Sequence, residues 1–107
     1  MYFIDPSELE AKELFPGVTM RAAWGEKIML SFIDLGPHSV VPEHKHPHEQ
    51  MGIVLEGEFE FTIGGETKVV KAGEAYYIPS NVPHSVRTPA QKARALDIFS
   101  PPREEYK

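Results

Sequence analysis

The residues with the clearest capacity for chemistry are the five histidines, which fall in two places. Four lie between positions 38 and 48, and His84 stands alone. His44 and His46 are two residues apart, so in an extended segment their side chains share one face and can reach one point. Imidazole nitrogens are good ligands for zinc, copper, iron and nickel ions. The pair therefore indicates a metal site, and the alternative interpretation is a solvated histidine-rich loop.

A second group of interest lies near the C-terminal end of the chain. If residues 93–99 form a strand, Asp97 and Phe99 share one face and Ile98 takes the other, where it suits a core face. Asp97 and Phe99 then look into the interior, where a carboxylate is costly unless it is paired or used. Arg103 follows a Ser-Pro-Pro turn and could swing back over that interior. The alternative is an Asp97–Arg103 ion pair that fastens the chain end, with Phe99 in the core.

The elements that must position these groups are mostly short strands. Apolar or alternating stretches are separated by turn residues, a pattern typical of a sandwich or barrel. The expected strands cover residues 18–23, 28–35, 51–55, 59–63, 67–70, 75–78, 85–87 and 93–99, with a tight hairpin at Gly64-Gly65. One helix is expected over Asp5–Leu14, because Asp5 suits the N-cap and Pro6 the first helical position. We predict an all-β fold with one short N-terminal helix.

The length and charge of the chain exclude several classes of protein. Its 107 residues suit a single domain, residues 1–107, with one core. Eleven basic and sixteen acidic residues give a net charge of −5, and the basic residues are scattered, so no nucleic-acid partner is expected. Because the overall field does not attract an anion, an anionic ligand would need a local cationic site.

Three features that the sequence lacks exclude further classes of protein. The chain has no cysteine, which excludes disulfide frameworks and thiol nucleophiles. The first residues lack the pattern of a signal peptide, and no stretch of sequence is apolar enough to cross a membrane. We therefore expect a cytoplasmic protein that does not bind membranes.

Two motifs resemble those of the cupin family. The first is His44-Lys45-His46-Pro47-His48-Glu49-Gln50, with Gly57 after six further residues. The second consists of Gly73, Pro79, Asn81 and His84, and an expected hairpin over residues 51–70 joins the two. The resemblance implies a double-stranded β-helix, the jelly-roll barrel of cupins, with one divalent transition metal. It also implies that the ligands are His44, His46, Gln50 and His84, and it leaves open whether the metal is Zn, Ni, Mn or Fe.

Two positions depart from the cupin pattern. Most cupins carry a glutamate where this chain has Gln50, and Thr88 stands where a small residue such as asparagine is usual. Three neutral imidazoles and a neutral amide would leave the full 2+ charge on the metal, which favours an anionic ligand. The alternatives are that Gln50 points elsewhere, or that Glu49 is the ligand, although a regular strand would turn Glu49 the other way. We expect His48 at the rim and His38 in solvent.

The neutral glutamine and the C-terminal group together resemble the pectin degradation protein family. These single-domain cupins linearise unsaturated uronates released from pectin and alginate. The resemblance implies conversion of cyclic 4,5-unsaturated uronates to the linear keto form, an isomerase-like reaction at a metal site. It implies Asp97 as the general acid/base, Phe99 and Arg103 as binding residues for the anionic sugar substrate, and a two-pronged contact of Arg103 with the carboxylate. Arg21 is a further candidate for that contact.

Two other functions are compatible with the residues. A metal-dependent dioxygenase could use three histidines on Fe(II), but it would not need Asp97 or Arg103. A non-enzymatic cupin that binds sugars or other small molecules would keep the pocket and need no proton shuttle. We also expect a homodimer, because the apolar run Ile28–Ile33 offers more hydrophobic surface than one barrel of 12.1 kDa easily covers.

Overall fold

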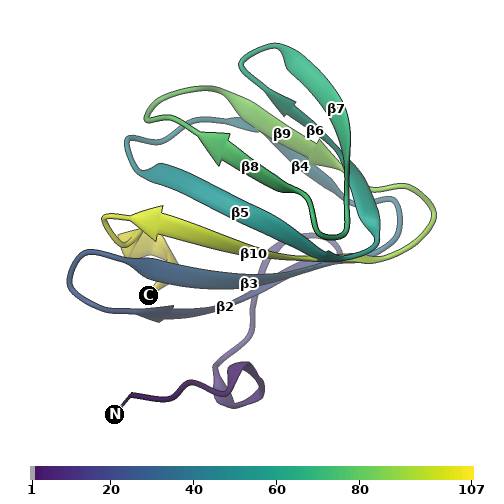
Figure 1. Cartoon of the computed structure of the whole chain (residues 1–107). Helices are drawn as coiled ribbons and strands as arrows, with labels where there is room; N and C mark the ends of the chain where they lie inside the picture. The colour runs from purple at the N-terminus through teal and green to yellow at the C-terminus, as the bar shows by residue number, and fades with distance from the viewer. Residues whose placement is uncertain (1) are drawn as a thin grey trace.

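The strands pair into two antiparallel sheets that face each other (Figure 1). The computed structural model describes residues 2–107. Within this range the strands are β1 (Lys12–Phe15), β2 (Val18–Trp24), β3 (Met29–Leu35), β4 (Val40–His44), β5 (Glu49–Glu56), β6 (Glu58–Ile63), β7 (Glu66–Lys71), β8 (Ala75–Ile78), β9 (His84–Arg87) and β10 (Ala93–Ser100). The larger sheet has the order β1-β2-β3-β10-β5-β8 and the smaller one the order β4-β9-β6-β7. The expected double-stranded β-helix is confirmed.

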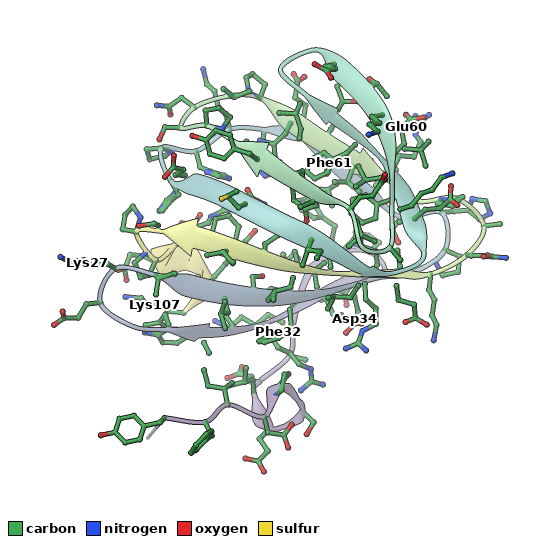
Figure 2. All side chains as sticks on the ribbon, in the orientation of Figure 1. Lys27, Phe32, Asp34, Glu60, Phe61 and Lys107 are labelled. Carbon is green, nitrogen blue, oxygen red and sulfur yellow. The ribbon has the colours of Figure 1, made fainter. Side chains whose placement is uncertain are left out.

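Alternation along the strands places the core between the two sheets. Successive side chains of a strand point to opposite faces, and β5 and β10 bury every second residue along most of their length. Figure 2 shows side chains of both sheets filling the space between them, Phe61 of β6 among them. The buried cluster consists of Val18, Leu35, Val54, Phe59, Phe61, Val70, Tyr76, Ile78, Ala93 and Ala95. Each expected strand overlaps an observed one, with ends that agree within two residues.

The expected helix over Asp5–Leu14 is wrong in its length. Asp5 does cap a helical turn, since its side chain accepts a hydrogen bond from the Ser7 amide at 3.0 Å, but the 3-10 helix η1 covers only Pro6–Glu8. Residues 12–15 instead form β1, which pairs with β2 at the edge of the larger sheet. Local helix propensity is a weak preference, and here the pairing with β2 overrides it. A second 3-10 turn, η2, covers Glu104–Tyr106.

Strand β4 was also not expected as a strand. Its sequence contains Pro42 and Glu43, and its burial does not alternate, so it lacks the usual apolar signal. Proline lacks an N–H donor and is tolerated on edge strands, and β4 is the edge of the smaller sheet. Residues 2–107 contain no helix that is long and apolar enough to span a membrane.

A tight turn at Gly57 joins β5 to β6 and returns the chain from the larger sheet to the smaller one. Its φ of 76° lies in the left-handed region that favours glycine. A Cβ atom at this position would lie 2.6 Å from the carbonyl oxygen of Lys92, a backbone atom with little freedom to move. Gly65, in the β6–β7 hairpin, has a similar φ of 83°, but nothing lies within 4 Å of its Cβ position.

This pair of glycines allows strain and steric clash to be separated. We predict that Gly65→Ala lowers the free energy of unfolding by about 1 kcal/mol, the cost of a left-handed conformation for alanine. Gly57→Ala should lower it by clearly more, because the clash with Lys92 adds to the same conformational cost. Chemical denaturation of both variants measures the difference, and equal losses would contradict the packing described for Gly57.

Candidate metal centre and adjoining cavity

Three histidines from two separate parts of the chain converge on one point. His44 ends β4, His84 begins β9, and the two are paired across these neighbouring strands. His46 lies in the loop that follows β4. The ring centroids of His44 and His84 are 4.2 Å apart, and those of His46 and His84 are 5.0 Å apart. One ring nitrogen from each histidine lies within 4.8 Å of the others, so the three side chains could hold one metal ion.

Hydrogen bonds to the backbone fix the orientation of all three imidazoles. In each ring Nδ1 lies 2.9–3.0 Å from a backbone carbonyl oxygen two residues away, to which it donates. Such a bond leaves Nε2 as the unprotonated nitrogen that can bind a metal. The Nε2 atom of His84 is buried and has no hydrogen-bond partner among the described residues. Because buried polar atoms normally have a partner, this orphaned nitrogen fits a bound metal ion.

The electrostatic environment keeps the buried rings neutral. The pKa of His84 is lowered to about 4, mainly by burial, with smaller contributions from the charges of His44, His46 and Arg103. Burial is also the main cause that lowers the pKa of His46, followed by the positive charge of Arg103. Neutral imidazole is the form that binds metal, so no proton has to leave these two rings at neutral pH.

Gln50 joins this cluster from the larger sheet. Its side chain is buried, and its Oε1 atom lies 3.1 Å from Nε2 of His46, on the metal-facing side of that ring. The amide oxygen is therefore close enough to the cluster to serve as a fourth ligand. Glu49 lies on the opposite face of β5, where it is exposed and accepts a hydrogen bond from the Tyr77 hydroxyl at 2.6 Å. The alternative in which Glu49 replaces Gln50 at the site is thus wrong.

The two histidines that were expected to be uninvolved lie outside the cluster. His38 is exposed, in a turn with a positive φ of 53°. His48 is partly exposed, and its ring centroid lies 5.5 Å from that of His46, beside the cluster and not in it.

A cavity of about 290 Å³ adjoins the histidines. Six of the seven expected site residues line it, and His46 approaches the same cluster from the loop. The polar and charged lining residues are His44, Gln50, Tyr76, His84, Asp97, Arg103 and Tyr106. The rest of the lining is apolar, with Phe99 among the aromatic side chains. The cavity therefore combines an apolar wall with a small number of convergent polar groups, as ligand sites usually do.

Asp97 occupies the middle of β10 and faces the cavity. Its side chain is buried, and one oxygen accepts a hydrogen bond from the Tyr76 hydroxyl. Burial raises the pKa of Asp97 to about 6, although hydrogen bonds from Tyr76 and Gln50 and the charge of Arg103 lower it in part. The expectation that Asp97 and Phe99 look inward is confirmed. Ile98, however, points to the outer face and is only partly buried, so its assignment to a core face is wrong.

Arg103 reaches the cavity from the segment after β10. Its guanidinium donates to Glu105 Oε1 from Nε at 2.8 Å and to the Tyr106 hydroxyl from Nη1 at 2.9 Å, and Nη2 lies 2.7 Å from the same Glu105 oxygen in an ion pair. It also lies over two aromatic rings, 4.1 Å from the centroid of Tyr106 and 5.2 Å from that of Phe99. No ion pair joins Asp97 to Arg103 in residues 2–107, so the alternative of a fastening ion pair is wrong.

Two lining residues were missed from the sequence, and one candidate lies elsewhere. Tyr76 alternates with Ala75 and Tyr77, and this period-two pattern could have assigned it to the inner face. Tyr106 lies in a polar tail that gave no periodic signal. Arg21 does not line the cavity, since its guanidinium binds the carbonyl oxygen of Leu9 at 2.5 Å and holds the N-terminal segment.

The histidine cluster predicts which substitutions abolish metal binding. His44→Ala and His84→Ala should each remove a stoichiometric divalent ion, because each leaves too few ligands around the shared point. His38→Ala is the matched control, since His38 lies outside the cluster, and it should bind as much metal as the unsubstituted chain. Elemental analysis after dialysis measures the content. Full metal content in a His44→Ala, His84→Ala double variant would show that the metal binds elsewhere.

The buried carboxyl group predicts a pH-dependent contribution to stability in the metal-free protein. The pKa of Asp97 in the folded chain, about 6, is above the ordinary 3.8, so protonation of Asp97 favours folding. This contribution is complete below pH ~4 and is lost as the pH rises through about 6. The unfolding free energy of the unsubstituted chain minus that of Asp97→Asn should therefore fall by about 2–3 kcal/mol between those limits. Urea titrations at several pH values test this, and a constant difference would contradict it.

Comparisons with known proteins agree with this geometry. The family of cupin domains matches residues 31–99. The pectin degradation protein KdgF of Dickeya dadantii is 32% identical over 107 residues, which cover 98% of this chain and 96% of that protein.

Two solved structures are similar over the whole chain. KdgF from Halomonas sp. has a TM-score of 0.92 at 25% identity and covers 100% of this chain and 99% of its own. An RmlC-like cupin from Shewanella frigidimarina has a TM-score of 0.93 at 27% identity, and the match covers 100% of this chain and 96% of that one. The motifs, the barrel and these similarities lead to one conclusion: this chain belongs to the cupin family and, within it, to the family of the pectin degradation proteins.

Proposed function

We propose that this chain converts cyclic 4,5-unsaturated uronates, which arise from pectin and alginate breakdown, to their linear keto form. The observation that carries the proposal is the convergence of three kinds of group on one cavity. These groups are the histidine cluster, the buried carboxyl of Asp97 and the guanidinium of Arg103. The similarity to a pectin degradation protein over nearly the full length supports the choice of substrate class.

The cavity supports a small anionic sugar as the substrate. Its volume of about 290 Å³ lies at the lower end of the range for ligand pockets, which suits a monosaccharide better than an oligosaccharide. The contacts of Arg103 with Glu105 and Tyr106 leave at least one N–H group on each terminal nitrogen. These two groups could bind the substrate carboxylate in a two-pronged contact. Phe99 offers an aromatic surface to the apolar face of the sugar.

The metal site completes the polar side of the cavity. We propose that His44, His46, His84 and Gln50 hold one divalent transition metal, with Zn, Ni, Mn and Fe as the candidates. When bound, such an ion would act as a Lewis acid and offset negative charge on the substrate. Because these four ligands are neutral, they would leave the full 2+ charge on the metal ion.

The reaction is an isomerisation, and its protons balance within the substrate. The bond between C1 and the ring oxygen breaks, the C1 hydroxyl loses its proton to become an aldehyde, and the enol oxygen at C5 becomes a ketone as C4 gains a proton. One group that can both accept and donate a proton therefore suffices. With a pKa of about 6, Asp97 is populated in both forms near neutral pH, as general acid–base catalysis requires.

Two substitutions separate the proposed roles of Asp97 and Arg103. Asp97→Asn should keep the fold and the metal but lower kcat by about 10²–10⁴, the usual contribution of general acid–base catalysis. Arg103→Ala should mainly raise KM, by about 10- to 100-fold, because it removes charge-assisted hydrogen bonds to the carboxylate. Loss of the C4–C5 double bond, followed by ultraviolet absorbance, gives the rate, and NMR identifies the product. A fully active Asp97→Asn protein with its metal in place would refute this mechanism.

We also propose that the chain is a cytoplasmic homodimer, paired through the outer face of the larger sheet. On β5 the outward residues Met51, Ile53 and Leu55 are all exposed. The run Ile28–Ile33 adds Leu30 and Phe32 to the same face, since Met29 and Ser31 point inward. Such an uncovered apolar surface favours association with a second copy.

Light scattering tests the assembly. The unsubstituted chain should have about twice the monomer mass of 12.1 kDa at micromolar concentration. Met51→Glu should shift it toward the monomer, because it places a charge in the proposed interface. Val69→Glu, a comparably exposed position on the smaller sheet, is the control and should leave the mass unchanged. A monomeric unsubstituted chain would contradict the proposal.

A further inference from the structure

Three residues in a row across the larger sheet form an unusual arrangement beside the cavity. Asp97 of β10 is paired with Gly52 of β5, and Gly52 is paired in turn with Tyr76 of β8. Neighbouring strands lie about 4.8 Å apart, so residues two strands away are normally separated by the side chain between them. Here the middle residue has no side chain, and the outer two meet over it.

The contact between the outer residues is a buried hydrogen bond. The Tyr76 hydroxyl donates to Oδ1 of Asp97, and both side chains lie between the sheets. A Cβ atom on Gly52 would lie 2.3 Å from Oδ1 of Asp97 and 2.5 Å from Cε1 and Cζ of Tyr76. Even a methyl group would therefore occupy the space in which the two side chains meet. A glycine inside a central strand weakens a sheet and often marks a close approach of this kind.

The hydrogen bond from Tyr76 adds to the one from Gln50 in restricting how the Asp97 carboxyl group can turn. The terminal torsion of an aspartate side chain has broad minima, so packing alone fixes its plane poorly. Proton transfer requires the carboxyl group to hold one orientation toward the reacting atoms, and small displacements are costly to the rate. A donor that binds one oxygen of Asp97 sets that orientation.

We propose that Tyr76 is a positioning residue for Asp97, and that Gly52 provides the gap through which it acts. This inference rests on the proposed function, in which Asp97 transfers the proton. Tyr76 acts through Asp97, whereas Arg103 and Phe99 act on the substrate. Removal of the Tyr76 hydroxyl should therefore slow the chemical step and leave the contact between Arg103 and the substrate carboxylate intact.

The kinetic test uses a neighbouring tyrosine as its control. With an unsaturated galacturonate monosaccharide as substrate, Tyr76→Phe should lower kcat by about 10- to 100-fold, the cost expected for a misplaced catalytic group, with KM little changed. Tyr77→Phe removes a hydroxyl from the next residue, which is exposed and bound to Glu49, and should leave both constants unchanged.

A double variant distinguishes positioning from an independent effect. In an Asp97→Asn background, Tyr76→Phe should have little further effect on kcat, because the group through which it acts is already absent. An undiminished effect in that background, or an unchanged kcat of Tyr76→Phe alone, would overturn the inference.

A spectroscopic measurement tests the contact without relying on activity. The chain contains only three aspartates, Asp5, Asp34 and Asp97, so selective ¹³C labelling of their carboxyl carbons yields three NMR signals. In the zinc-loaded full chain, the signal that Asp97→Asn removes should move in Tyr76→Phe and stay in place in Tyr77→Phe. The Asp5 and Asp34 signals should not move in either variant.

The two readouts separate failure of the inference from failure of the proposed function. An unsubstituted chain that does not consume the uronate would refute the proposed function, and the NMR signals would still decide whether Tyr76 holds Asp97. An active chain in which Tyr76→Phe leaves the Asp97 signal unmoved would refute the positioning role alone. Gly52→Ala should also move the Asp97 signal. If Gly52→Ala does not fold, Tyr76→Phe alone decides whether Tyr76 positions Asp97.

Discussion

The hydrogen bonds from the histidine rings to the backbone are the interactions on which the candidate metal centre depends. Each carbonyl oxygen lies two residues from its histidine, so a short stretch of local chain both presents the ring and sets its tautomer. The bond consumes Nδ1 and leaves Nε2 for the shared point between the rings. The pairing of β4 with β9 then brings His44 and His84 together, and the loop after β4 adds His46.

Hydrogen bonds also link the other polar groups that line the cavity. Gln50 has its amide oxygen beside His46 and forms a hydrogen bond with Asp97. Asp97 in turn accepts a hydrogen bond from the Tyr76 hydroxyl, and Arg103 donates to Glu105 and Tyr106. In an interior of low polarity such a network stabilises one arrangement of its members, because an unpaired member would be costly. The net charge of −5 does not attract an anion, so an anionic ligand would depend on local positive charge such as that of Arg103.

Features that depend on local pattern could be predicted from the sequence, and features that depend on strand order could not. Alternation within residues 93–99 assigned Asp97 and Phe99 to the inner face, and the spacing of His44 and His46 indicated a shared point. The contact of Asp97 with Tyr76 could not be predicted, because it requires knowing that β8 lies beside β5 and that β5 lies beside β10. Strand β1 was not predicted for a similar reason, since its pairing with β2 outweighs the helix signals that begin at Asp5.

The cavity draws its groups from two separable parts of the fold. The groups that we assign to metal binding and proton transfer lie on strands, where the sheets hold them in register, except His46, which lies in the loop between β4 and β5. Arg103 and Tyr106 come instead from a short turn after β10, outside both sheets. Changes in that turn could alter the size and charge of the accepted molecule without disturbing the barrel. The fold thus separates the residues that we propose to select the substrate from those that we propose to carry out the chemistry, so a change in a few residues of the tail could alter specificity.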